Sequence, residues 1–197
     1  CILMAWEHGN LKTGTKTYYN ITCIRKKAKK VYRNPRLRRW QQMLKAYKYR
    51  IYPTNEQKEQ IAKTFGCCRF VYNRTLAYRK EAYEKEKKTV NKTNCNNYCN
   101  QVLKKEYGWL KEVDKFALTN AIYNMDAAYQ KFFKEHTGYP KFKSKHDGHK
   151  SYTTNFTNGN ITADFDRGKV KLPKLKEVKA KLHRNFIGQI KSATVSQ

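Results

Sequence analysis

Few of the side chains could carry hydrolytic chemistry, and those few are scattered. Of 197 residues only 15 are Asp or Glu, and the closest carboxylate pair outside the expected helices is Asp164 and Asp166. Two residues apart, they would lie on the same side of a strand, as the carboxylates of a metal-dependent hydrolase can. Arg167-Gly168 follows at once, and Asp and Gly are typical turn residues. We therefore interpret the pair as part of a turn.

Sulfur and imidazole groups offer four possible zinc ligands. Cys95 and Cys99 are one helical turn apart, and His146 and His149 are separated by two residues. Zinc ribbons and fingers instead carry close CxxC pairs. We interpret the cysteines as buried helix residues and the histidines as loop residues.

Nucleophilic and nucleotide-hydrolysing sites have no counterpart in the sequence. His8 and His183 are accompanied by no Ser or Cys in a nucleophile-elbow context, and both standard glycine-rich phosphate loops are missing. The sequence therefore predicts no catalytic residue, no metal site and no cofactor in this chain.

Charge and aromatic rings favour nucleic-acid binding. Lys and Arg number 43, so the formal net charge is +28, and 14% of the residues are aromatic. In the segment 139–145, Tyr-Pro-Lys-Phe-Lys-Ser-Lys, rings stand beside ammonium groups, which allows stacking on unpaired bases while phosphates are neutralised. We expect binding to weaken sharply as salt rises.

Hydropathy and cysteine content indicate the cellular compartment in which the chain is expected. Mean hydropathy is −0.96, and no stretch approaches the roughly 18 apolar residues of a spanning helix, so we expect no membrane association. Six cysteines without a secretory signal indicate reduced thiols and a cytoplasmic location. Because the chain starts at Cys1 and stops within the alternating segment 190–195, we expect a fragment at both ends.

The first 42 residues differ in character from the rest. They carry 11 Lys or Arg against the single Glu7, without helical or strand periodicity. Such blocks of like charge are typical of solvated chain. We expect residues 1–42 to form a disordered basic arm, or to precede a true start at Met43.

Regular patterns begin at Met43. Residues 43–53 alternate as a half-buried strand, and Thr54 with Gln57 forms a capping box for a helix that Gly66 ends. A second helix over 67–88 would complete a helix-turn-helix.

A third helix is expected over 94–106, and a fourth begins at Asp114. The fourth carries an apolar stripe at the spacing of a core-facing helix: Leu118, Ala121, Ile122, Met125, Ala128, Tyr129, Phe132 and Phe133. Helices would thus occupy 54–137.

Short strands follow in 138–197. They are expected at 151–157, 160–163, 169–172, 177–182 and 188–195, with hairpin-type turns at Asn158-Gly159 and Arg167-Gly168. The fold class is therefore α+β, a small β-barrel with a helical bundle inserted after its first strand. That first strand, 43–53, must pair with the later strands because one strand cannot bury its face alone.

Several blocks of residues 43–197, in order, resemble the TnpB (OrfB) family of bacterial insertion sequences. They are Arg50-Ile51-Tyr52-Pro53-Thr54, Phe65-Gly66-Cys67-Cys68-Arg69-Phe70-Val71-Tyr72-Asn73, Trp109-Leu110-Lys111-Glu112-Val113-Asp114-Lys115-Phe116-Ala117-Leu118, Ala128-Tyr129-Gln130-Lys131-Phe132-Phe133, Gly138-Tyr139-Pro140-Lys141-Phe142-Lys143, Asn155-Phe156-Thr157-Asn158 and Lys169-Val170-Lys171-Leu172-Pro173-Lys174-Leu175. The resemblance implies an RNA-guided DNA endonuclease, related to type V CRISPR nucleases, with an oligonucleotide-binding-like wedge (WED) barrel, a helical recognition (REC) domain and a RuvC-like nuclease domain. Only the first two match here. The RuvC carboxylates with their Mg²⁺ and the structural zinc site are expected beyond residue 197.

The same resemblance implies partners and residue roles. A guide RNA from the transposon end and a double-stranded DNA target would bind, with one protein monomer on one RNA. Base-reading contacts to the motif beside the target would come from Lys115, Phe116, Thr119, Thr157 and Asn158. Contacts to the nucleic-acid backbone would come from Arg69, Arg74, Lys141, Lys143, Lys169, Lys171 and Lys174.

Two other functions remain open. The chain could be a stand-alone DNA-binding regulator derived from TnpB without the nuclease part. It could also be a ribosomal or structural RNA-binding protein, which would explain the charge but not the family-like blocks.

Overall fold

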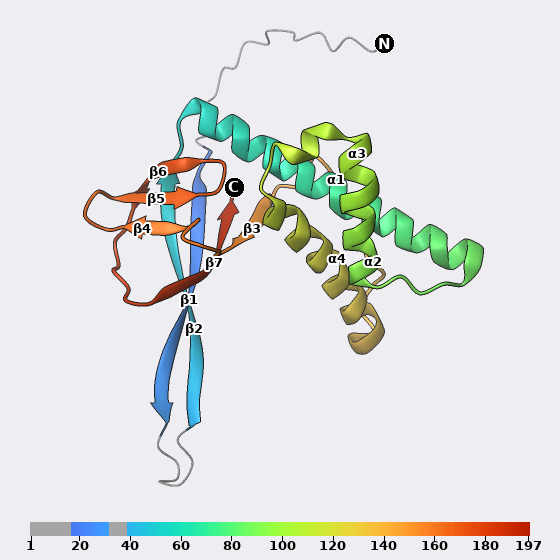
Figure 1. Ribbon diagram of the computed structural model, residues 1–197, viewed down its shortest axis with the longest axis horizontal. Helices are drawn as coiled ribbons and strands as arrows, with labels where there is room; N and C mark the ends of the chain where they lie inside the picture. Colours follow the sequence, from blue (N-terminus) through green and yellow to red (C-terminus); the bar gives the residue numbers. More distant parts are fainter. Residues whose placement is uncertain (1–16, 32–38) are drawn as a thin grey trace.

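The computed structural model describes residues 17–31 and 39–197 as an antiparallel sheet beside a layer of helices (Figure 1). The strands are β1 (Tyr19–Val31), β2 (Arg39–Tyr52), β3 (Ser151–Asn155), β4 (Thr162–Asp164), β5 (Lys169–Leu172), β6 (Lys176–Lys181) and β7 (Gln189–Ser196). The helices are α1 (Asn55–Glu86), α2 (Lys92–Tyr98), α3 (Lys104–Glu106) and α4 (Lys115–Glu135). A π-helical turn, Cys99–Leu103, joins α2 to α3, and a 3₁₀ turn, Gly108–Lys111, precedes α4. The predicted α+β class is confirmed.

The sheet has the strand order β3-β7-β1-β2-β6-β5-β4. β1 and β2 pair along their whole length, and in Figure 1 their far ends run out beyond the other strands as a two-stranded ribbon. The predicted pairing of the first family-like strand with the carboxyl-terminal part is confirmed, because residues 50–52 pair with 179–181. In the described part of the chain β3 and β4 have one strand partner each, so the sheet is open.

The prediction of a disordered arm over residues 1–42 is wrong for residues 19–31, because these residues form β1 between β2 and β7. Ile21 and Cys23 are fully buried there, on the same face of the strand. The run of basic residues after Cys23 hides this short alternation from a reading of the sequence. β2 also begins earlier than expected, at Arg39. The rest of the predicted arm, 1–16 and 32–38, lies outside the described residues.

One predicted hairpin is right and the other is wrong. Arg167-Gly168 joins β4 to β5, which pair with each other. Asn158 and Gly159 form a tight turn with φ of 48° and 71°, closed by a 3.1 Å hydrogen bond from the Asn160 amide to the Thr157 carbonyl. That turn closes no hairpin, because β3 pairs with β7 and lies at the opposite edge of the sheet from β4.

α1 is a single helix of 32 residues that runs through Gly66. The capping box of Thr54 and Gln57 starts it as predicted. The predicted break at Gly66 is wrong, because buried Phe65 and Cys67 on either side of it pack into the same core. A glycine weakens a helix by only about 1 kcal/mol, which such burial outweighs.

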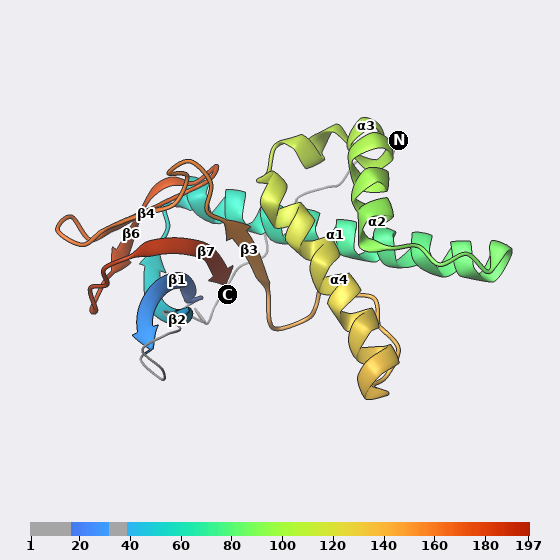
Figure 2. The ribbon, with the colours of Figure 1, turned by 60° about the horizontal axis from the view of Figure 1, so that its bottom comes forward.

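α4 buries most of the stripe predicted for it. Asp114 is its N-cap, and its buried residues include Leu118, Ile122 and Met125. Phe133 departs from the prediction, because 64% of its surface is exposed. Figure 2 shows why: the carboxyl-terminal end of α4 extends away from the sheet.

The helices and the sheet share one core. α4 packs against both α1 and β3. At the other end, the Gln57 side-chain amide at the start of α1 donates hydrogen bonds of 3.0 and 2.9 Å to the carbonyls of Leu175 and Glu177. Among the described helices, none combines the length and apolarity that crossing a bilayer would demand.

Candidate nucleic-acid interface

The start of α4 and strand β3 are fastened together by buried polar contacts. A single oxygen of Asp114, Oδ2, accepts hydrogen bonds from the Ala117 amide (3.1 Å) and from the Thr154 hydroxyl (2.7 Å). One turn later, the Asn120 side-chain amide donates to the Thr153 carbonyl at 2.8 Å. Because buried polar groups need partners, these bonds fix how the helix sits on the strand. We call residues 114–120 together with 153–158 the α4–β3 junction.

The three base-reading candidates on α4 occupy its first turns. Lys115 is exposed, and its Nζ lies 5.1 Å from the ring centre of half-buried Phe116. Thr119 donates its hydroxyl to the Lys115 carbonyl at 3.1 Å, so that hydroxyl bonds within the helix. Lys115 is therefore the one of the three that presents a charged group at the surface.

The other two candidates lie in the turn that follows β3. Thr157 and Asn158 are exposed. The Asn160 carboxamide fixes the turn, since its oxygen accepts from the Thr157 amide at 2.7 Å and its nitrogen donates to the Asn155 carbonyl at 3.0 Å. The five candidates therefore lie on the first turns of α4 and in the turn that follows β3, the strand that is hydrogen-bonded to α4. That they read bases remains a prediction.

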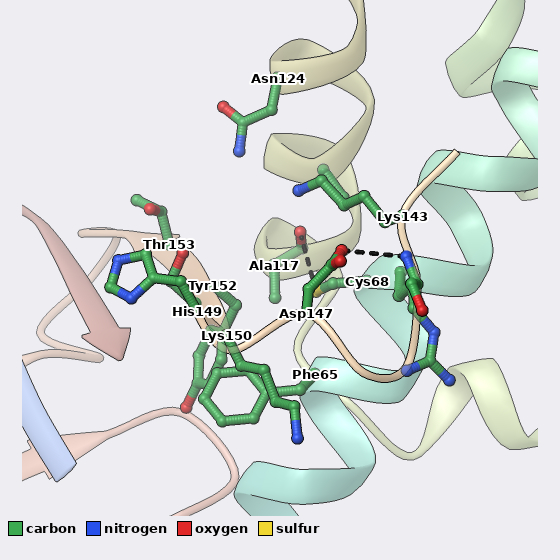
Figure 3. A pocket seen from close by; sticks show the side chains of 14 residues that line it. Phe65, Cys68, Ala117, Asn124, Lys143, Asp147, His149, Lys150, Tyr152 and Thr153 are labelled. Atoms are coloured by element: carbon green, nitrogen blue, oxygen red, sulfur yellow. Dashed lines mark hydrogen bonds between the residues drawn. The ribbon is translucent and has the colours of Figure 1, made fainter. Parts of the chain in front are cut away.

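A pocket opens where α1, α4 and the segment before β3 meet, and Figure 3 shows its lining side chains. Two of the predicted backbone-binding residues, Arg69 and Lys143, line it together with Lys150 and His149. Asp147 also lines it, but its carboxylate accepts a 2.9 Å hydrogen bond from the Ser144 amide. The list of lining residues is completed by Phe65, Cys68, Ala117, Ala121, Asn124, Ser144, Ser151, Tyr152 and Thr153.

The backbone of Lys143 is held in place by Asn73 of α1. The Asn73 carboxamide donates to the Lys143 carbonyl at 3.0 Å and accepts from its amide at 2.8 Å, while the Lys143 Nζ lies 4.6 Å from the Tyr72 ring centre. Asn73, His149 and Lys150 were not predicted. Nothing in the sequence singles out one lysine among so many, and pairing of Asn73 with a residue 70 positions away leaves no local pattern.

The remaining predicted backbone contacts lie elsewhere. Lys169, Lys171 and Lys174 are on β5 and the turn after it, and four strands separate β5 from β3 in the sheet. The Lys169 ammonium is 3.0 Å from a Glu177 carboxylate oxygen, and this hydrogen bond lowers the pKa of Glu177. Arg74 and Lys141 are exposed, the former with its guanidinium 6.0 Å from the Phe70 ring centre. The seven residues therefore do not form one surface.

Asp164 has the turn role expected of it. It accepts hydrogen bonds from the Arg167 amide (2.9 Å) and from Nε (2.7 Å), and the amide bond is the main cause of its lowered pKa. The described cysteines are free and buried, and burial raises the pKa of Cys95 to about 11. Within 17–31 and 39–197, no three His, Cys, Asp or Glu side chains come together as metal ligands would.

Fold and surface define a basic α+β protein in which the long helix α1 directly follows strand β2. A family model described as a helix-turn-helix domain of OrfB of IS605 matches residues 43–88, which include most of β2 and all of α1. A putative RNA-guided DNA endonuclease of Streptomyces pristinaespiralis is 36% identical over 51% of this chain and 25% of its own length. The putative RNA-guided DNA endonuclease InsQ of Escherichia coli K12 is 27% identical over 78% of this chain and 38% of its own.

A shorter relative is covered almost completely. The virulence protein VsdF of Salmonella dublin is 38% identical over 46% of this chain and 83% of its own length. The chain belongs to the TnpB (OrfB) family, with a TnpB-like amino-terminal segment. It spans well under half of the two relatives named as endonucleases.

Proposed function

We propose that this chain is the part of a transposon-encoded RNA-guided DNA endonuclease that binds the guide RNA and the duplex motif beside the DNA target. In this proposal the sheet is the WED domain and helices α1 to α4 are the REC domain, and one monomer acts on one RNA at the bacterial nucleoid. The Mg²⁺ and zinc sites of the family would be carried by other residues. The role that we propose for the described residues is binding.

The α4–β3 junction is the observation that carries this proposal. Lys115 is exposed on α4, and Asn158 is exposed in the turn that follows β3, the strand that the Asp114–Thr154 bond joins to the start of α4. Side chains that read base edges must be held in a fixed relation, because hydrogen bonds tolerate little displacement. The net charge of +28 supplies the phosphate attraction that brings a duplex to such a site.

The RNA that the chain binds in bacterial cells tests the proposal. This RNA is purified together with the chain and sequenced, and reads from the transposon end are expected. Reads dominated by ribosomal RNA would contradict the proposal and favour a general RNA-binding protein.

Motif reading is tested separately, with DNA libraries randomised beside the target. Lys115→Ala should lose affinity for the preferred motif by about 5- to 150-fold and flatten the preference. Exposed Lys111, in the 3₁₀ turn before α4, is the matched control, and Lys111→Ala should keep the preference. Equal loss by Lys115→Ala for every motif would refute its base-reading role.

A stand-alone DNA-binding regulator is the second candidate, and the short relative favours it. Because 99 aligned residues cover 83% of VsdF, a protein of this family can consist largely of the shared part. Motif-specific DNA binding that survives complete removal of RNA by ribonuclease would support the regulator. Loss of that binding would support the guide-dependent role.

A further inference from the structure

A second hollow lies between the carboxyl-terminal parts of α1 and α4, which point away from the sheet (Figures 1 and 2). Its volume is about 700 Å³, within the range of pockets that hold small ligands. We call it the aromatic groove. It is lined by Arg79, Lys80, Tyr83, Glu84, Lys87, Lys88, Thr89, Val90, Tyr129, Phe132, Phe133 and Tyr139.

Three of the five aromatic rings that line the groove are exposed. Tyr83 is 58% exposed, Phe133 64% and Tyr139 43%. Tyr139 is held in place by two neighbours. Its hydroxyl lies 2.6 Å from the hydroxyl of buried Tyr129, and its ring centre is 5.4 Å from that of Phe132. Exposed apolar surface that is both grouped and rigid marks a binding site more often than scattered apolar residues do.

Cations surround these rings. Four Lys or Arg line the groove, and among the described lining residues Glu84 is the one carboxylate. Two of the cations have partners, because Arg79 is 2.8 Å from Asp126 and Lys80 is 3.7 Å from Glu84. Lys87 places its Nζ 5.2 Å from the ring centre of Tyr83. The groove therefore combines open ring faces with an excess of positive charge.

We propose that the aromatic groove binds unpaired bases of a single-stranded nucleic acid, with the bases stacked on Tyr83 and Phe133. Lys87 and Lys88 would then contact the adjoining phosphates. Every base has a π face, so such stacking tolerates sequence, and ammonium groups beside the rings neutralise the backbone. An apolar protein segment is a poorer occupant, because it would leave the cations at the rim unpaired. The inference rests on the proposed function for the identity of the polymer.

The test uses the full chain and a fluorescent oligoriboadenylate of about 12 nucleotides. An oligomer of equal length with abasic sugars has the same phosphates but no bases. Anisotropy titrations should show at least about fivefold tighter binding of the adenylate. That ratio should persist as salt rises, because only the phosphate contacts depend on salt. An oligodeoxyadenylate run in parallel shows whether the strand is RNA or displaced DNA.

Variants then locate the effect. Phe133→Ala and Tyr83→Ala should each lower adenylate affinity about fivefold and leave abasic binding unchanged. Tyr123→Ala is the matched control, because Tyr123 is 43% exposed on the same helix, with Lys92 Nζ 5.5 Å from its ring centre, and does not line the groove. It should leave both affinities unchanged.

Three results would overturn the inference. They are equal binding of adenylate and abasic oligomers, unchanged adenylate affinity in both groove variants, and a change of oligomeric state on Phe133→Ala, which would assign the groove to a second copy of the chain. Failure of the proposed function is a separate result, namely absence of transposon-end RNA from the purified chain while adenylate still binds through the groove.

Discussion

Replacing Asp114 by Ala should destabilise the protein and loosen the α4–β3 junction. The substitution removes the N-cap of α4, which costs about 0.5–2 kcal/mol. It also leaves the hydroxyl of Thr154, a residue with only 1% of its surface exposed, without its 2.7 Å acceptor, which costs about 1–3 kcal/mol. We therefore expect a loss of about 3 kcal/mol in the free energy of unfolding, measured by urea denaturation with circular dichroism.

Asp114→Asn is the matched control. Because one oxygen of Asp114 accepts both hydrogen bonds, the single carbonyl oxygen of Asn can accept both in the same place. Its loss should stay below about 1 kcal/mol. In a double-mutant cycle with Thr154→Val, the Asp114→Ala loss should shrink by about 1 kcal/mol or more, because no hydroxyl is left unpaired. Additive losses in that cycle, or a loss below about 0.5 kcal/mol for Asp114→Ala, would refute the reasoning.

Three further predictions concern the scaffold. Gly66→Ala should stabilise the protein by about 0.5–1 kcal/mol, because α1 continues through Gly66 and no atom of a packed neighbour lies within 4 Å of the added Cβ. Gly168→Ala should instead cost about 1–2 kcal/mol, because the φ of Gly168 is 61°. Both changes are measured from the urea midpoints. Gln57→Ala should cost about 1–2 kcal/mol by the same measurement, since the hydrogen bonds to Leu175 in the turn after β5 and to Glu177 of β6 are lost together with the capping box. Burial raises the pKa of Cys23 to about 12 and that of Cys67 to about 11, from 9.0. Neutral thiols thus stabilise the fold fully below about pH 9, and the urea midpoint should fall as pH rises from there toward 11–12.

Each of these predictions has a clear contrary result. If Gly66→Ala destabilises the protein, the result would support a helix break at Gly66 and contradict a continuous α1. Gln57→Glu keeps the capping oxygen but sets a carboxylate against two carbonyls, so it should be at least as harmful as Gln57→Ala, and a milder effect would contradict the contact to the sheet. For the thiols, equal urea midpoints at about pH 8 and about pH 10.5 would show that their burial is not linked to stability.

Local chemistry made much of the molecule predictable from its sequence. The capping box at Thr54 and Gln57, the N-cap Asp114 and the turn at Arg167-Gly168 all depend on atoms within three or four residues. The strands of the last third were found from alternation and turn residues for the same reason. The positive charge, and with it the expectation of a polyanionic partner, needs only the composition.

Partners distant in the sequence decided the rest. The residues of a strand do not specify which strand it pairs with. Only the tertiary structure therefore shows that β1 lies between β2 and β7, and that β3 pairs with β7 and not with β4. The pairing of Asn73 with Lys143 holds the segment before β3 against α1 and so helps to form the pocket that Arg69 and Lys143 line, although these residues are far apart in the sequence. The apolar stripe of α4 predicts which face of the helix is buried, but not how much of that face other elements cover. Phe133 is exposed because α4 runs on past the sheet, and the aromatic groove exists only through that overhang.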